Sequence, residues 1–225
     1  RNSKRLPDQI DQTTSNIGLE YEWFTTDYRF NPRKGFDMKF TGSAGIRRIR
    51  PNNNISNLKD PSNPGFNYQS LYDSVGLQAY TFRLRASAAK YFKTGKQTTF
   101  KTAVNAGLVQ SPRIFRNELY QLGGFRLLRG FDEESIFASA YAVATAEYRI
   151  LIGLNSYIYA FADGGWARNN SQFANTSNTY IGSGLGLAFE TKAGIFNIAF
   201  AAGKRDDLPF NLRQSKIHFG YVNFF

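Results

Sequence analysis

The sequence predicts an all-β fold in which antiparallel strands form a transmembrane β-barrel. Three observations predict it. Apolar and polar residues alternate with a period of two through most of the chain, the pattern of strands with two unlike faces. The predicted strands have about 10–16 residues, more than the roughly 5–6 of a typical strand and enough to cross a bilayer at a tilt. Their connections sort into short and long sets, as in membrane barrels with short turns at one end.

The composition agrees with this fold. The 225 residues include 21 Phe and 13 Tyr, and such aromatic residues form the girdles of membrane barrels at the two interfaces. The mean hydropathy of −0.42 is low because inward-facing positions are polar. The longest run of apolar or small residues, 136–146, is too short for a spanning helix of roughly 20 residues. A soluble all-β barrel or sandwich is the alternative, but it would not normally sort its connections by side.

Charge and residue usage exclude several function classes. The net charge is +11, yet Lys and Arg occur in pairs at most, or alternate along strands as Arg83 and Arg85 do. We therefore expect no nucleic-acid binding. The absence of Cys excludes disulfides and thiolate sites, and the single His218 excludes a multi-histidine metal site. We expect no metal site, no cofactor and no catalytic residue.

The pattern divides the chain into a polar end and a barrel portion. Residues 1–14 are polar and are predicted to be a loop or chain end, and residues 15–225 are predicted to carry about nine strands. The strands are expected from Ser15 and then at 36–49, 78–92, 97–108, 135–150, 156–167, 179–191, 194–203 and 215–225. The long connections are expected at 50–77, 109–134, 168–178 and 204–214.

The connection 109–134 contains a segment rich in Gly and Arg, and we expect it to fold into the barrel lumen. Glu147 lies on the polar face of the next strand, and Asp163 faces the lumen if its apolar neighbours face lipid. Two neighbouring carboxylates repel one another unless a cation lies between them. The planar guanidinium of Arg129 suits bidentate pairing with a carboxylate, Gly130 allows a sharp turn, and Phe131 can pack against lumen aromatics.

Other interpretations fit some of these residues. From spacing alone, Arg129 could equally be a solvated loop residue, with Glu147 and Asp163 as ordinary lumen charges. The two acids could also act as acid and base, but no nucleophile accompanies them, so we do not expect an enzyme. Glycines alternate at 182–186 and superficially suggest a phosphate loop. Their strict period of two inside a predicted strand favours a small-residue lumen face.

Leu128-Arg129-Gly130-Phe131 resembles the [V/I/L]-R-G-[F/Y] motif that loop six carries in one family, the BamA/TamA-type outer-membrane insertases and related two-partner-secretion translocators. The F-x-D-x-G strand motif resembles Phe161-Ala162-Asp163-Gly164-Gly165, and the D-x-x-x-x-P-x-x-G periplasmic turn resembles Asp27 to Gly35. The aromatic-terminated C-terminal β-signal of outer-membrane proteins is similar to the segment with Gly220, Tyr221 and Phe225.

The resemblance implies a fold and a location. The family barrel has sixteen strands, with loop six between strands eleven and twelve. Five predicted strands follow the motif here, as in the family, and four precede it. We therefore expect this chain to be the C-terminal part of such a barrel in the bacterial outer membrane. The earlier strands and the periplasmic POTRA domains would lie upstream of Arg1.

The resemblance also implies a function without covalent chemistry. The protein would be an outer-membrane assembly factor whose barrel opens between its first and last strands and templates incoming strands. Arg129, held by Asp163 and Glu147, would lock loop six inside the lumen. The partners would be outer-membrane lipids, nascent outer-membrane proteins and accessory assembly proteins. A polypeptide secretion translocator of the same superfamily, or a self-contained small barrel acting as a pore or membrane enzyme, are the alternatives.

Overall fold

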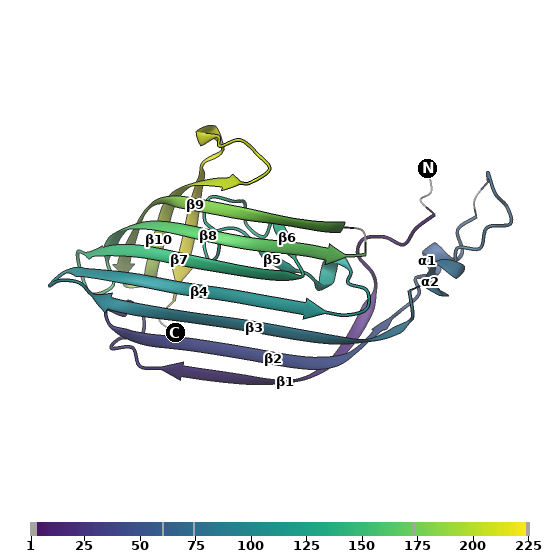
Figure 1. The fold of residues 1–225 in the computed structure, drawn as a ribbon, viewed down its shortest axis with the longest axis horizontal. Coiled ribbons are helices and arrows are strands. Elements are labelled where there is room, and N and C mark those ends of the chain that lie inside the picture. The colour runs from purple at the N-terminus through teal and green to yellow at the C-terminus, as the bar shows by residue number, and fades with distance from the viewer. Residues whose placement is uncertain (1–3, 60, 74, 173, 224–225) are drawn as a thin grey trace.

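A computed structural model describes residues 4–59, 61–73, 75–172 and 174–223, and in these residues nine strands form one sheet (Figure 1). The strands are β1 (Gln12–Phe24), β2 (Gly35–Ile49), β3 (Gln78–Lys93), β4 (Thr98–Gln110), β7 (Ala140–Leu151), β8 (Tyr157–Ser171), β9 (Ala174–Thr191), β10 (Gly194–Arg205) and β11 (Lys216–Val222). They follow one another in chain order, and each neighbouring pair is antiparallel.

The remaining elements are short and lie in the connections. A hairpin of β5 (Tyr120–Leu122) and β6 (Ile136–Ala138) encloses the Gly- and Arg-rich segment. The others are α1 (Asn53–Ser56), α2 (Ser70–Asp73), η1 (Arg116–Glu118) and η2 (Leu212–Gln214). None of the helices in the described part of the chain has the length and apolar character to cross a membrane.

The sheet curls, so that β10 and β11 lie behind the strands at its centre (Figure 1). The segment between β4 and β7 lies on the concave side, which we call the inner face. There the Tyr120 hydroxyl donates to the backbone carbonyl of Leu84 on β3 at 2.9 Å, while the loop tip reaches β8 and β11. Within the described residues, β1 and β11 each pair with one strand only, so the sheet is open.

The two faces of the sheet differ as the alternating pattern predicts. The outer face carries exposed apolar side chains from the first strand to the last. Ile17 and Leu19 on β1 are each 83% exposed, and Phe219 on β11 is also exposed. The inner face carries buried polar and charged side chains, among them Glu147 and Arg149. Apolar exposure on this scale is unusual for a soluble monomer and is typical of a surface that meets lipid or another protein.

The largest buried core forms between the inner face and the folded-in connection. It contains Val109, Ile114, Leu119, Tyr120, Leu122, Leu128, Ile136, Ala138, Tyr141, Val143, Ala167 and Tyr180. Seven of these residues, from Ile114 to Ala138, belong to the connection itself. The connection is therefore a packed part of the fold, because its apolar side chains are removed from water by the strands that surround them.

One predicted connection was wrong. Residues 168–178 are not a loop, because β8 continues to Ser171 and β9 begins at Ala174. The Asn-rich sequence indicated a turn, yet Asn170 pairs with Asn175 in the ladder. These strand ends lie beyond the apolar band of the outer face, where a strand can be polar on both sides. The short connections predicted after β3, β7 and β9 are confirmed.

Two further boundaries differ from the prediction. The expected strand 135–150 is divided at Ser139, which is buried and donates its backbone N–H to the carbonyl of Arg168 at 2.8 Å. Its first part is β6, which pairs with β5 inside the region predicted as the loop 109–134. The segment predicted as a polar end, 1–14, is also ordered in part: β1 begins at Gln12, and Leu6 and Ile10 are buried in a second cluster with Phe115.

Candidate functional site

The tip of the folded-in connection, residues 125–131, has a constrained backbone. Leu128 has a φ of 59° and Gly130 a φ of 98°, both in the left-handed region that favours glycine. A Cβ at Gly130 would also lie 2.7 Å from the carbonyl carbon of Ala202 on β10. Gly130 therefore satisfies two demands together, a left-handed turn and close contact with a strand. Leu128 takes the same conformation with its side chain fully buried.

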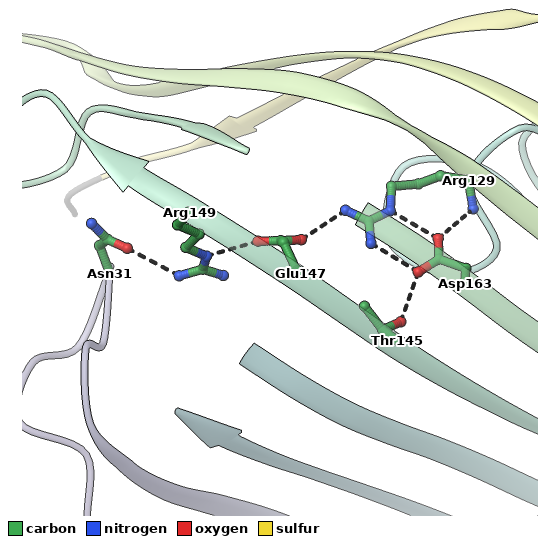
Figure 2. Close-up of polar contacts among 6 residues, drawn as sticks. All are labelled: Asn31, Arg129, Thr145, Glu147, Arg149 and Asp163. Atoms are coloured by element: carbon green, nitrogen blue, oxygen red, sulfur yellow. Dashed lines mark hydrogen bonds and ion pairs between the residues drawn. The ribbon is translucent and has the colours of Figure 1, made fainter. Parts of the chain in front are cut away.

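Arg129 is the charged residue at the tip, and it binds two acids on neighbouring strands (Figure 2). Its Nε and Nη2 atoms donate to Asp163 Oδ2 and Oδ1 at 2.9 and 2.8 Å, and its backbone N–H donates to Oδ2 at 3.1 Å. Its Nη1 donates to Glu147 Oε2 at 2.8 Å. Arg129, Glu147 and Asp163 are 7%, 5% and 2% exposed. The predicted lumen acids are thus both brought to the predicted Arg, with bidentate geometry at Asp163.

The ion pair continues in both directions as a chain of alternating charge (Figure 2). Glu147 Oε1 accepts from Arg149 Nε at 2.7 Å, and Arg149 Nη1 donates to Asn31 Oδ1 at 3.0 Å. At the other end, Thr145 Oγ1 donates to Asp163 Oδ1 at 2.8 Å. Each carboxylate oxygen of Glu147 and Asp163 accepts at least one hydrogen bond. Buried charges are tolerated when paired and hydrogen-bonded in this way.

Aromatic rings on β8 complete the surroundings of the guanidinium. The guanidinium carbon of Arg129 lies 3.6 Å from the ring centre of Phe161 and 6.0 Å from that of Tyr159. A cation over the face of an aromatic ring is attracted by the ring quadrupole, most strongly where water is excluded. Phe161 thus contributes to holding Arg129, in addition to the two acids.

The strand motif on β8 now has a physical explanation residue by residue. Phe161, Asp163 and Gly165 are two residues apart and so share the inner face. Phe161 stacks on Arg129, and Asp163 pairs with it. At Gly165 a Cβ would lie 2.7 Å from a methyl carbon of Leu128. The strand motif is the receptor for the loop motif, and its glycine leaves room for Leu128.

The last residue of the loop motif, Phe131, packs against a tyrosine of the wall. Its ring meets that of Tyr180 on β9 edge to face, with centroids 5.3 Å apart. Backbone contact extends to β9 as well, because a Cβ at Gly182 would lie 2.0 Å from the carbonyl oxygen of Arg129. Of the small-residue lumen face predicted at 182–186, Gly182 therefore lies against the loop tip, whereas Gly184 and Gly186 leave room for the rings of Phe161 and Tyr159.

The turn from Asp27 to Gly35 supports the far end of the charged chain. Asp27 Oδ1 accepts from the backbone N–H groups of Arg33 and Lys34 at 2.9 and 3.2 Å. Partial burial acts to raise the pKa of Asp27, but these backbone hydrogen bonds outweigh it and hold the pKa below its usual value. The turn positions Asn31, which is buried and donates to the carbonyl of Leu154 at 3.0 Å.

Two of the predicted C-terminal signal residues, Gly220 and Tyr221, lie on β11 at one edge of the sheet. Gly220 on β11 faces inward, where a Cβ would lie 2.4 Å from Phe125 of the loop tip. Tyr221 faces outward, and its ring lies 4.9 Å from that of Phe196 on β10. Phe225 lies outside the described residues.

Sequence reasoning missed three members of the site. Arg149 was detectable, because it lies two residues after Glu147 on the same strand and so shares its face. Asn31 and His218 were not, since Asn31 meets Arg149 and His218 meets Gly130 across long separations in the sequence. His218 Nε2 accepts the backbone N–H of Gly130 at 3.0 Å. Nothing in the sequence near His218 indicated this contact.

The geometry of the site fits attachment of the loop tip better than acid–base chemistry. Glu147 and Asp163 both have their oxygens engaged by guanidinium groups, and the hydroxyl beside them, on Thr145, donates to Asp163. Removing Arg129 would leave the buried Asp163 without its cation and Glu147 with Arg149 alone, and losing one partner of a buried ion pair costs about 3–5 kcal/mol. The site is built to keep the loop tip on the inner face.

Comparison with known proteins identifies a family. The model of the Omp85 superfamily domain matches residues 3–225, nearly the whole chain. Proteins of this superfamily are β-barrels of the outer membrane. No curated protein matches the chain.

Proposed function

The chain belongs to the Omp85 superfamily, and we propose that it is an outer-membrane assembly factor that inserts β-barrel proteins. Membership supports a role in outer-membrane assembly or translocation in general. The observation that carries the finer proposal is the attachment of Arg129 to Asp163 and Glu147. It keeps a packed loop on the inner face, where a passive pore would need open space.

The outer surface supports a location in lipid. Exposed apolar side chains run along the outer face from β1 to β11, opposite polar and charged inner positions. Burying such a surface in hydrocarbon is favourable, and the alternation is that of outer-membrane barrels. We propose that the nine strands are the C-terminal part of a sixteen-stranded barrel in the bacterial outer membrane.

The edges of the sheet support templating. Backbone groups that lack a partner are costly in lipid, so a strand edge there must pair with another strand. Within the described residues, β11 pairs only with β10. We propose that the far edge of β11 pairs with strands of the barrel or, during assembly, with a strand of the incoming protein, by main-chain hydrogen bonds. No covalent step is involved.

The proposed partners follow from this mechanism. They are outer-membrane lipids around the outer face, nascent outer-membrane proteins at the seam, and accessory assembly proteins together with POTRA domains on the periplasmic side. A translocator of the same superfamily would instead pass a polypeptide through the lumen, and for that the loop tip would have to leave the inner face.

Insertion by the full-length protein in lipid vesicles tests the proposal. An unfolded outer-membrane barrel protein is added, and its protease-protected fraction is measured over time. We expect Arg129→Ala to slow insertion by about tenfold or more, since the buried Asp163 loses its cation and Glu147 loses one of its two. Arg126→Ala is the matched control, because Arg126 is an exposed Arg of the same loop tip.

Two outcomes would contradict the proposal. Wild-type insertion and protease resistance in Arg129→Ala would show that insertion does not need the ion pairs of Arg129, which we call the lock. Vesicles that insert no barrel protein but pass an unfolded polypeptide into their interior would favour the translocator.

A further inference from the structure

The inner face of the last strand contacts the loop tip, or the residue directly after it, at three successive inward positions. Lys216, His218 and Gly220 are two residues apart on β11. Lys216 Nζ pairs with Asp132 Oδ1 at 2.7 Å. His218 Nε2 accepts the Gly130 N–H, and Gly220 lies against Phe125. Each inward residue of the strand centre thus meets a different part of the loop.

The three attachments differ in strength. The Lys216 and Asp132 side chains are 35% and 70% exposed, and ion pairs open to water contribute little because water screens them. The His218 contact is buried, with the imidazole only 7% exposed. Removing its acceptor would leave the buried N–H of Gly130 without a partner, which is costly. Phe125 packs on the cluster of Tyr159, Phe161, Ala199 and Ala201, so the loop bridges from that cluster to Gly220. His218 and Phe125 therefore carry most of the attachment.

The strand has little else to hold it. β11 has seven residues, each paired with β10, and no second strand flanks it in the described residues. Its outward side chains, Ile217, Phe219 and Tyr221, are exposed. A short edge strand of this kind frays unless something besides one neighbour holds it. The loop supplies that support from the inside.

We infer that the loop tip supports β11 by contacts from the inner face, an arrangement that we call the splint. We also infer that His218 is a positioning residue, which fixes the last strand through the backbone of Gly130. The biological use rests on the proposed function: a rigid β11 presents its outer backbone edge in one register to an incoming strand. The Arg129 ion pairs and the last strand are then connected through the loop tip. The lock fixes the loop tip on β7 and β8, and the loop tip fixes β11.

Amide hydrogen exchange of the full-length protein in lipid tests the splint without depending on any substrate. His218→Leu removes the acceptor, whereas His218→Gln keeps a side-chain carbonyl able to accept the Gly130 N–H. We expect exchange over 216–222 to rise about tenfold in His218→Leu, as for one lost hydrogen bond, and much less in His218→Gln. Exchange over β8 should stay unchanged in both, because the Arg129 contacts remain.

A second variant keeps the test independent of how His218 is replaced. Phe125→Ala removes the contact with Gly220 and leaves both Arg129 and His218 in place, and it should also raise exchange over 216–222. Unchanged exchange of β11 in both His218→Leu and Phe125→Ala would overturn the splint. Faster exchange with unimpaired insertion of a barrel protein would support the splint and contradict the proposed use of the β11 edge.

Discussion

The folded-in connection is attached to the sheet by two buried ion pairs of opposite polarity. At its tip the loop supplies the cation, Arg129, and the wall supplies the acids. At its base the loop supplies the acid, Glu118 of η1, and the wall supplies the cation, Arg47 of β2. Arg47 Nη1 donates to Glu118 Oε2 at 2.7 Å and to the carbonyl of Arg113 at 2.6 Å. Both sites are buried, yet they are not equivalent.

The two sites differ in how completely their polar atoms are satisfied. At the tip, three guanidinium nitrogens of Arg129 and all four carboxylate oxygens take part in hydrogen bonds. At the base, Nε and Nη2 of the fully buried Arg47 have no hydrogen-bond partner within the described structure. An incompletely satisfied buried pair is weak evidence for stability, since its desolvation is not fully offset.

The surroundings of each site explain this difference in hydrogen bonding. The base lies in an apolar cluster with Phe115, beneath the ring that Arg47 approaches at 5.4 Å. Around it the N-terminal segment is attached to the connection, with Arg116 donating its backbone N–H to the backbone carbonyl of Asp8 at 2.9 Å. The base therefore packs the N-terminal segment against the folded-in connection. The tip carries the contacts to β8 and β11 that the proposed function uses.

The largest expected effect is at the tip. Arg129→Ala should lower the free energy of unfolding by about 3–5 kcal/mol, because Asp163 remains buried without its cation and Glu147 keeps only Arg149. The measurement is denaturant unfolding of the full-length protein in detergent. Arg126→Ala should change the value by no more than about 0.5 kcal/mol, as surface substitutions usually do. A loss at Arg129 no larger than at Arg126 would contradict the tip as the stronger attachment.

A smaller loss is expected at the base. Glu118→Gln should cost about 2 kcal/mol, because the uncharged amide still accepts a hydrogen bond but leaves Arg47 as an unpaired buried charge. The same unfolding measurement applies. A cost exceeding that of Arg129→Ala would reverse the ranking of the two sites.

Replacing the whole base pair by apolar residues should cost least among the buried changes. Arg47→Met combined with Glu118→Leu is expected to stay within about 1 kcal/mol of wild type in stability, since apolar residues of similar size often replace buried pairs without loss. Insertion of barrel proteins should be retained. Loss of insertion with normal stability would show that the base, too, has a role beyond packing.

The smallest change in stability is expected at an exposed ion pair. Lys39 on β2 pairs with Glu20 and Glu22 on β1 at 2.8 and 2.6 Å, and all three side chains are exposed. Lys39→Met should change stability less than any of the buried substitutions, and the difference should shrink in high salt, because water and salt screen exposed ion pairs. A cost comparable with that of Glu118→Gln would mean that burial does not separate these ion pairs.

The contrast between tip and base also shows what the sequence could predict. Arg129, Glu147 and Asp163 were predictable because strand periodicity fixes which side chains face inward, and because one cation and two acids complement each other. Arg47 and Glu118 were not, since a 71-residue separation and an irregular connection give no period to follow. Residues 168–178 were wrongly predicted as a loop for a related reason. Beyond the apolar band, strands and loops have the same polar composition.

The most direct test of the tip lock is a double-mutant cycle between Arg129→Ala and Asp163→Ala. Unfolding free energies are measured for the wild type, both single variants and the double variant of the full-length protein. Because the two residues form a bidentate buried pair, we predict a coupling energy of about 2–3 kcal/mol. A coupling energy near zero would contradict the lock, because Arg129 would then contribute to stability without Asp163.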